Sequence, residues 1–365
     1  MIKLVISDLH ISAGTPTGEY SPYEDFHYDD ALAEFLDFYS SGEYRNIPVE
    51  LILNGDILDP LKVSVGNTFP DRITNAIALE KVGLCLNGHP TIVRCWRKFL
   101  SQSNKSITYI MGNHDLEVAY LSVQDLLRSI IAGPSNQDRI RFRIFDPFYD
   151  LPGGVRVCHG NQFEALNRVD YHRLFITRGG QDPCLNLPWG SIFLLKVLLP
   201  IKEQRPYITQ IHPFSRYFAL AMLSDTSVAL PAGMRASYYF FKTRFWEARQ
   251  RSASLKQTFS ILQEEAVVAP ELADVAFSMM AADPRLTAVV MGHSHAAKIR
   301  HFGQRDAIYV NTGTWTKLIS LDLSDLGVHT RFTYSLIDYR DTSAVPKVRL
   351  FRWFGNQKPY SELRY

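Results

Sequence analysis

Cysteine is scarce in this 365-residue chain, which has only four, at positions 85, 95, 158 and 184. None of them forms a C-x-x-C pair, and this excludes thiolate zinc sites and redox dithiols. A disulfide framework is not expected in a chain of this length. We therefore expect the protein to work in a reducing compartment.

A charge excess and a long apolar run are also lacking. The formal net charge is only +2, too small to indicate a nucleic-acid binder from bulk electrostatics. No segment reaches the roughly 18 consecutive apolar residues that a membrane-spanning helix needs. The segment Met1–His10 has neither the apolar run nor the cleavage site of a signal peptide. We expect a cytoplasmic protein, either free or peripheral on the inner membrane face.

What the sequence does contain is a series of short apolar runs rich in Val and Ile, each ending in polar residues. Their length and β-branched content favour buried strands over helices. Amphipathic helices are predicted over Asp29–Tyr39 and Asp115–Ile131. Strands alternating with helices predict an α/β fold with a layered, mainly buried sheet. The predicted strands are Ile2–Ser7, Val49–Asn54, Ile107–Met111, Val155–Cys158, Thr287–Met291 and Ala307–Val310.

Residues 165–284 interrupt this alternation, because they contain no clear strand but much apolar and basic material. We predict a largely helical insertion that caps a core made of residues 1–164 and 285–340. Two consecutive helices are expected over Leu255–Ala269 and Pro270–Ala282, with Pro270 in a first-turn position. Residues 341–365 are polar and basic, and are predicted as a C-terminal tail without an assigned role.

Side chains that bind metals follow the predicted strands. In open α/β sheets, ligands bind at the carboxyl ends of the strands, and glycines allow the chain to turn sharply there. Pairs spaced by two residues on an extended segment face the same way. We expect this for Asp8 with His10 and for His293 with His295. The five clusters are Asp8 and His10, Asp56 and Asp59, Asn113 and His114, His159, and His293 and His295.

Imidazole, carboxylate and amide ligands without thiolate suit Mn²⁺, Fe or Zn²⁺. Two such ions about 3.5–4 Å apart can clamp a phosphate, with a bridging hydroxide delivered in line with the leaving oxygen. A carboxylate such as Asp56 can bridge two ions. Taken alone, His10 would be a surface histidine and Asp56 or Asn113 a turn residue. The joint pattern favours a two-metal site.

The order D-x-H, G-D-x-x-D, G-N-H-D, H and G-H-x-H, from residue 8 to residue 295, resembles the calcineurin-like metallophosphoesterase superfamily. The resemblance implies an α/β/β/α core and a metal-dependent phosphoesterase with two divalent ions, Mn first, with Fe and Zn as alternatives. It assigns Asp8, His10 and His295 to the first ion. It assigns Asn113, His159 and His293 to the second, with Asp56 bridging.

The same resemblance gives His114 the task of stabilising charge or protonating the leaving oxygen. Asp59 would orient His114, and this position is equally compatible with a plain turn or a salt bridge. Asn161, in the sequence His159-Gly160-Asn161, is a candidate substrate contact. Thr312 and Thr314 follow the last core strand and are candidates too, with a tight turn as an equal alternative.

The insertion is the feature that can discriminate among substrates, since the metal motifs alone do not choose one. Residues Arg235–Lys256 interleave six cations with six aromatic residues and a single acid, and Leu187–Pro200 is apolar. This composition is typical of a segment that lies on an anionic membrane or binds acyl chains. A cap packed on itself is equally compatible. Nucleic-acid binding by aromatic stacking is a third reading, which the small net charge disfavours.

Within the superfamily, the chain is most similar to UDP-2,3-diacylglucosamine hydrolases of lipid A synthesis, which yield a lipid monophosphate and UMP. It has Gly112-Asn113-His114-Asp115 where those enzymes carry G-N-R-D, His159-Gly160-Asn161 where they carry H-G-D, and a longer insertion. The resemblance implies a pyrophosphate hydrolase for a nucleotide-linked lipid. The alternatives are a soluble phosphodiesterase, nuclease or phosphatase, and lastly a degenerate binding scaffold, although no ligand is missing. The sequence leaves the oligomeric state and any membrane partner open.

Overall fold

The structure of the protein is a computed structural model. It describes residues 1–365 apart from 16–20, 178–179, 213, 243–269, 304–306, 322–325, 342–344, 357–358 and 364–365. The predicted helix over Leu255–Ala269 and most of the aromatic and basic stretch that ends at Lys256 therefore lie outside the described residues.

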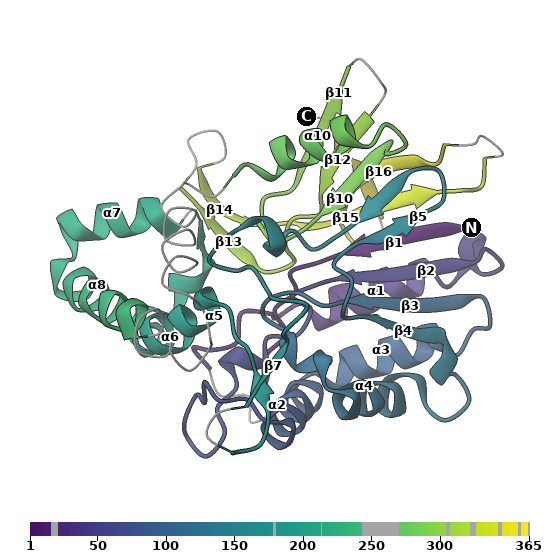
Figure 1. The fold of residues 1–365 in the computed structure, drawn as a ribbon. Helices are drawn as coiled ribbons and strands as arrows, with labels where there is room; N and C mark the ends of the chain where they lie inside the picture. The colour runs from purple at the N-terminus through teal and green to yellow at the C-terminus, as the bar shows by residue number, and fades with distance from the viewer. Residues whose placement is uncertain are drawn as a thin grey trace.

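Two β-sheets form the centre of the molecule (Figure 1). The larger sheet contains β1 (Ile2–Ile6), β2 (Val49–Asn54), β3 (Lys105–Ile110), β4 (Ile140–Arg143), β15 (Phe332–Asp338), β16 (Lys347–Trp353) and β17 (Tyr360–Glu362). The smaller contains β5 (Tyr149–Leu151), β6 (Val155–Val157), β10 (Ala288–Met291), β11 (Lys298–Phe302) and β12 (Ala307–Asn311). Their strand orders are β17-β16-β15-β1-β2-β3-β4 and β11-β12-β10-β6-β5.

The strands that precede the predicted ligands run parallel within each sheet. Strands β1 to β4 are parallel to one another in the larger sheet, and β6, β10 and β12 are parallel to one another in the smaller. The remaining pairings, which involve β15, β16, β17, β5 and β11, are antiparallel. The parallel strands of each sheet therefore bring their carboxyl ends to one edge.

Four layers result from the packing of helices on the two sheets (Figure 1). The inner faces meet in an aliphatic core that includes Val5 and Ile52 of the larger sheet and Val157 and Val290 of the smaller. Helices α1 (Asp29–Phe38), α2 (Asn75–Gly88), α3 (Pro90–Leu100) and α4 (Leu121–Leu127) cover the outer face of the larger sheet. Helix α10 (Leu272–Ala282) covers the smaller. The predicted α/β/β/α fold is confirmed.

Several predicted elements differ in detail from those observed. Strand β2 has the predicted bounds, but the segment predicted as a helix over Asp115–Ile131 is divided. A 3₁₀ turn over Leu116–Ala119 precedes α4, and a π-type turn over Arg128–Ala132 follows it. Helix α10 begins at Leu272, so Pro270 lies before its first turn. Residues 347–353, predicted as part of a tail, form β16 inside the larger sheet.

The insertion contains helices, as expected. It also contains short strands, which the sequence did not predict. Its helices are α5 (Trp189–Phe193), α6 (Leu199–Lys202), α7 (Phe214–Ser224) and α8 (Thr226–Phe241), and its strands are β7 (Phe175–Ile176), β8 (Cys184–Leu185) and β9 (Ile211–His212). Strand β9 pairs with β13 (Lys317–Ser320), which pairs in turn with β14 (Gly327–Thr330). Within the described residues, each helix is too short or too polar to cross a bilayer.

Candidate metal centre

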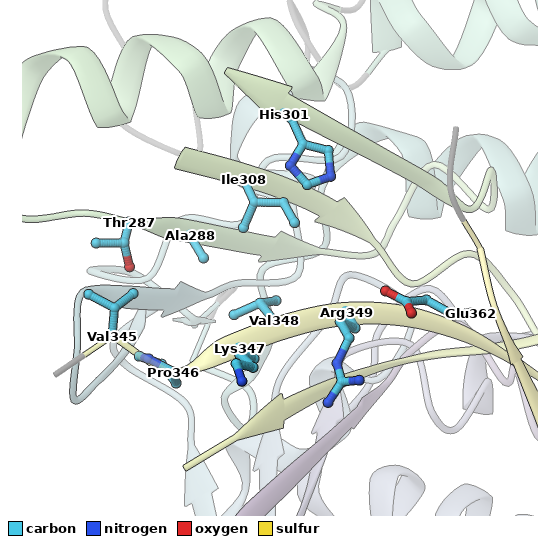
Figure 2. A pocket seen from close by; sticks show the side chains of 10 residues that line it. All are labelled: Thr287, Ala288, His301, Ile308, Val345, Pro346, Lys347, Val348, Arg349 and Glu362. Atoms are coloured by element: carbon cyan, nitrogen blue, oxygen red, sulfur yellow. The ribbon is translucent and has the colours of Figure 1, made fainter. Parts of the chain in front are cut away.

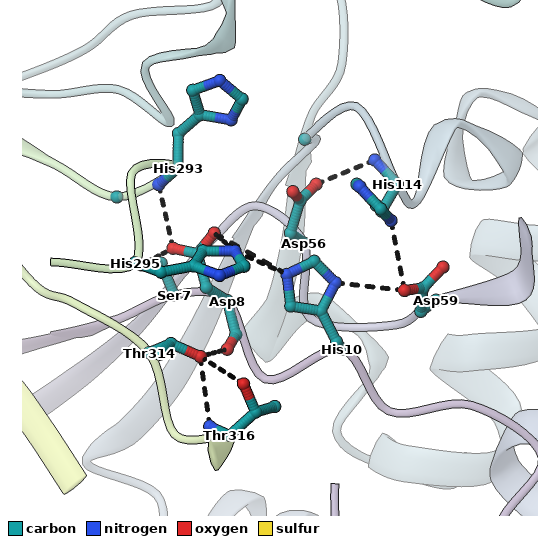
Figure 3. Close-up of polar contacts among 12 residues, drawn as sticks. Ser7, Asp8, His10, Asp56, Asp59, His114, His293, His295, Thr314 and Thr316 are labelled. Atoms are coloured by element: carbon teal, nitrogen blue, oxygen red, sulfur yellow. Dashed lines mark hydrogen bonds and ion pairs between the residues drawn. The ribbon is translucent and has the colours of Figure 1, made fainter. Parts of the chain in front are cut away.

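The predicted metal ligands meet where the carboxyl ends of the two sheets face each other. Figure 3 shows side chains that follow β1, β2 and β3 of the larger sheet pointing towards those that follow β10 of the smaller. Two triads hold their nitrogen and oxygen atoms within 4.8 Å of one another. One triad is Asp8, His10 and His295, and the other is Asp56, His159 and His293. Asp56 also groups with His10 and His114, so it lies between the two triads.

Backbone strain is concentrated at these ligands. Among the described residues other than glycine, six have a positive φ, and five of them are Asp8, His10, Asp56, His293 and His295. This conformation costs on the order of 1–2 kcal/mol for a residue with a Cβ atom, and such residues cluster at functional sites. Asp8 and His10, like His293 and His295, therefore converge through left-handed turns. The expectation that each pair lies on an extended segment is wrong.

Two motif glycines are required because side chains of the site pack directly against them. A Cβ atom on Gly112 would lie 2.1 Å from Oδ1 of Asp56, and one on Gly292 would lie 2.6 Å from Oδ2 of Asp8. Neither glycine has a positive φ. The sequence suggested that glycines let the chain turn sharply. Gly112 and Gly292 are needed instead because side chains approach them closely.

Hydrogen bonds fix which nitrogen of two ligand histidines faces the site. Nδ1 of His159 donates to the carbonyl oxygen of Asn54 at 2.8 Å, so Nε2 is the nitrogen left to face the site. Nδ1 of His10 lies 3.1 Å from Oδ2 of Asp59, and its Nε2 lies 3.0 Å from Nε2 of His295. An outer carboxylate or carbonyl that orients an imidazole in this way is the usual support of a metal-binding histidine.

Unpaired buried atoms show that the site is built to hold cations. Within the part of the chain that the structure describes, Oδ1 of Asp8, Oδ1 of Asn113 and Nε2 of His159 have no hydrogen-bond partner. Buried polar atoms are normally paired, and an exception calls for an ion or another ligand. Nitrogen ligands bind about 2.0–2.1 Å from zinc, so two ligands of one ion lie roughly 3.0–3.4 Å apart. The 3.0 Å between His10 and His295 fits this spacing.

The surroundings of Asp8 and His10 lower the pKa of both side chains. Burial alone raises the pKa of Asp8, but a hydrogen bond and charge interactions with His295 and His159 bring it down to about 2. Burial lowers the pKa of His10 to about 4, although the hydrogen bond to Asp59 opposes this. At neutral pH the Asp8 carboxylate is therefore charged and the His10 imidazole neutral, which are the forms that bind metals.

His114 stands at the edge of the site and is held by the carboxylates around it. Its Nδ1 lies 3.1 Å from Oδ2 of Asp59, and its main-chain N–H donates to Oδ1 of Asp56 at 2.8 Å. Burial lowers the pKa of His114, but the charges of Asp59 and Asp56 outweigh this effect and raise it to about 9. His114 thus carries a proton at neutral pH. Nζ of Lys62 lies 2.7 Å from the same Asp59 oxygen.

The three predicted substrate contacts are buried close to the ligands, and their assignment stays a prediction. The Thr314 hydroxyl donates to the carbonyl oxygen of Asp8 at 2.6 Å. The Thr312 hydroxyl donates to the carbonyl oxygen of Met291 at 3.1 Å. Nδ2 of Asn161 donates to the carbonyl oxygen of Asn167 at 3.0 Å. Both threonines therefore anchor segments that carry metal ligands.

Three further residues belong to the site although the sequence did not single them out. Oε2 of Glu164 lies 2.5 Å from Nε2 of His293. The ring of His212, from β9 of the insertion, lies 4.4 Å from the ring of His295 between centroids. Asp115 accepts N–H groups of Gly112 and Ile57 and thereby joins the turn after β3 to the turn after β2. Only Asp115 had a signal, as the last letter of the G-N-H-D motif.

A cavity of about 370 Å³ lies away from the candidate metal centre (Figure 2). It is lined by residues near the amino ends of β10, β12 and β16, among them Ala288, Ile308 and Lys347, with His301 of β11 above them. Its lining includes none of the residues of the two metal triads. The size of a cavity therefore does not locate the chemistry in this fold, whereas the strained ligands do.

Residues 3–297 match the family model of the calcineurin-like phosphoesterases. The chain belongs to this family. It is therefore a metal-dependent phosphoesterase that uses divalent metal ions, and the two triads are the candidate binding groups within the described residues. No curated protein matches the chain at a significant level.

Solved structures are similar to this chain at low sequence identity. A dimetal phosphatase from Danio rerio is 9% identical, with coverage of 100% of this chain and 99% of that one and a TM-score of 0.38. Vps29 of Chaetomium thermophilum is also 9% identical, with coverage of 100% and 96% and a TM-score of 0.36. Vps29 of Entamoeba histolytica, complexed with Zn²⁺, is 9% identical, with coverage of 100% and 98% and a TM-score of 0.31.

Proposed function

We propose that this phosphoesterase uses two ions, Mn²⁺ by preference, to hydrolyse the pyrophosphate of a nucleotide-linked lipid such as UDP-2,3-diacylglucosamine. The products would be a lipid monophosphate and UMP. The observation that carries the lipid part of the proposal is the apolar surface of the insertion. A soluble phosphodiesterase, nuclease or phosphatase activity is the alternative that the experiments below separate from it.

Helices α7 and α8 expose large apolar side chains that a cap packed on itself would bury. Leu223 is 86% exposed and Met234 is 68% exposed. Figure 1 shows the α7–α8 hairpin extending from the sheets on the side of the insertion. Exposed apolar patches of this kind mark sites of interaction with proteins, ligands or membranes. The others on the hairpin include Leu220, Leu230 and Tyr238.

Cations accompany this apolar surface and suit an anionic lipid surface. Arg235 and Lys242 are both exposed on or next to α8. Each Lys or Arg near an anionic surface contributes about 1 kcal/mol of attraction, and apolar side chains that enter the interface add to it. A substrate with acyl chains would then be presented beside the metal centre.

In the proposed reaction, bound divalent ions supply positive charge to the phosphoryl oxygens and acidify water. The chain's own groups do the rest. Asp56 would hold both ions in place, and His114, protonated at neutral pH, would donate its proton to the leaving phosphate oxygen. Asp59 would keep Nδ1 of His114 oriented during this transfer. The buried carboxylate of Asp59 would keep the imidazoles of His10 and His114 fixed.

The substrate is tested by incubating the full chain with UDP-2,3-diacylglucosamine and Mn²⁺ and measuring UMP. Release of UMP is expected, and Asp56→Asn should abolish it. Asp274→Asn, a change at an exposed position on α10, is the matched control and should keep full activity. Soluble phosphodiesters hydrolysed well without UMP release would refute the lipid assignment while leaving the phosphoesterase intact.

The membrane part is tested by co-sedimentation with vesicles containing phosphatidylglycerol. The wild-type chain should sediment with them, and Met234→Glu should lower the bound fraction several-fold. Phe145→Glu is the control, because Phe145 and Met234 are both 68% exposed and Phe145 lies outside the insertion. Equal effects of the two substitutions, or no binding by the wild-type chain, would contradict membrane association.

A further inference from the structure

His212 is the residue of the insertion whose ring contacts a predicted metal ligand. Its ring centroid lies 4.4 Å from that of His295, at an interplanar angle of 51°. It also interacts electrostatically with His10, Asp8 and His293. The insertion therefore reaches into the metal centre at this point.

The Nε2 atom of His212 has no hydrogen-bond partner among the described residues. This atom is shielded from solvent, although the residue as a whole is only partly buried. Leaving a buried polar atom unpaired is unfavourable, and such atoms in native proteins mark places where a ligand or ion completes the bonding.

A metal ion is not the partner that this geometry favours. The triad of Asp8, His10 and His295 brings three ligand atoms within 4.8 Å of one another, and Asp56 lies next to it. In the described part of the chain, His212 belongs to no such group. Its ring therefore lies beside the first triad rather than within it.

The backbone that carries His212 is held rigidly. The main-chain N–H of Leu321 donates to its carbonyl oxygen at 2.8 Å, and β9 pairs with β13 at this residue. Just before β9, Gln210 and Thr209 both donate to the buried carboxylate of Asp25, each at 3.0 Å. A contact residue fixed in this way binds its ligand without paying for loop ordering.

We propose that His212 is a substrate-binding residue whose Nε2–H donates a hydrogen bond to a non-bridging oxygen of the phosphoryl group held at the first metal position. This inference rests on the proposed phosphoesterase chemistry and gives the insertion a direct part in it. Phosphoryl oxygens are charged acceptors, and bonds to them are stronger than neutral ones. The contact would also tie recognition of the phosphoryl group to the segment that carries the apolar hairpin.

The test uses inorganic phosphate as the probe and compares two substitutions in the full chain. His212→Phe keeps a ring against His295 but removes the nitrogen, whereas His212→Gln restores an amide donor near the position of Nε2. In calorimetry at saturating Mn²⁺, His212→Phe should raise the dissociation constant of phosphate about 10- to 100-fold. His212→Gln should recover part of that loss. His301→Phe, at an exposed position on β11, is the control.

Mn²⁺ titration of the same variants provides the second measurement. Stoichiometry and affinity should equal those of the wild-type chain. Weaker Mn²⁺ binding in His212→Phe would identify a metal ligand and overturn the proposal, and unchanged phosphate binding would reduce His212 to a packing residue. Both measurements are made without turnover. Wild-type protein that binds Mn²⁺ and phosphate but hydrolyses no nucleotide-linked lipid would therefore refute the proposed substrate alone.

Discussion

Nδ1 of His114 lies 3.1 Å from Oδ2 of Asp59. The same oxygen lies 3.1 Å from Nδ1 of His10, so one carboxylate supports both a predicted metal ligand and the predicted proton donor. The sequence indicated only the contact between Asp59 and His114. Changes at Asp59 and at His114 should therefore have different consequences.

We expect His114→Gln to lower kcat by about 10²- to 10⁴-fold, the usual contribution of a general acid, with both ions retained. Asp59→Asn should lower kcat and, in addition, weaken Mn²⁺ binding by about 10- to 100-fold through His10. Steady-state kinetics and metal analysis by mass spectrometry check both. Loss of metal from His114→Gln would instead show that His114 is structural.

Glu164 should influence one ion more than the other, because it contacts His293, which is predicted to bind the second ion. Glu164→Gln weakens the carboxylate that orients this imidazole and should lower the affinity for the second ion about 10- to 100-fold. Asn113→Ala should act on the same ion. A two-site Mn²⁺ titration distinguishes the ions, and Glu271→Gln, at an exposed position, is the control. An equal loss at both ions would contradict the division into two triads.

Asp25 should be important for stability, since it joins the core to the insertion. Its carboxylate contacts Nζ of Lys62 at 2.6 Å and Nζ of Lys202 at 2.8 Å, and both lysines are buried. Asp25→Asn leaves these cations without that partner and should lower the free energy of unfolding by about 3–5 kcal/mol. Asp274→Asn breaks an exposed pair with Arg300 and should cost less than about 1 kcal/mol. Chemical denaturation compares them.

His89 should make stability depend on pH. Burial lowers the pKa of His89, but hydrogen bonds to Asp29 and Glu24 outweigh this and raise it to about 9. A pKa raised on folding stabilises the protein fully below the unfolded value of about 6.5, and this contribution is lost as the pH rises through about 9. The difference in unfolding free energy between wild type and His89→Gln should shrink over that range. A difference that grows with pH would refute the assignment.

The six strands that the sequence predicted, and the polar side chains that follow them, depend on local patterns. A run such as Val49–Asn54 is mostly apolar, as is typical of a strand buried on both faces, and Gly55-Asp56 follows it directly. The helix α2 lacked such a signal because one of its core positions is Lys81, which is buried and donates to the carbonyl oxygen of Pro60. In β16, alternation of cations with Val348 and Leu350 was a usable signal for a strand.

His212 and Glu164, which the sequence did not single out, contact residues that are far away from them in the chain. His212 lies on a strand of two residues, too short for any periodic pattern, and contacts His295 only because β9 pairs with β13. Glu164 lies beside His293 although 129 positions separate them. Such residues are defined by the meeting of the two sheets and the insertion, which no local stretch of sequence encodes.

Left-handed backbone conformations occur at Asp8, His10, Asp56, His293 and His295. They oppose the stability of the fold to the predicted function of these side chains. Glycine adopts this conformation without the penalty of a Cβ atom, so replacing any of these five residues by glycine relieves local strain. Selection for stability alone would therefore favour glycine at these positions, whereas their predicted metal-binding role needs the side chains.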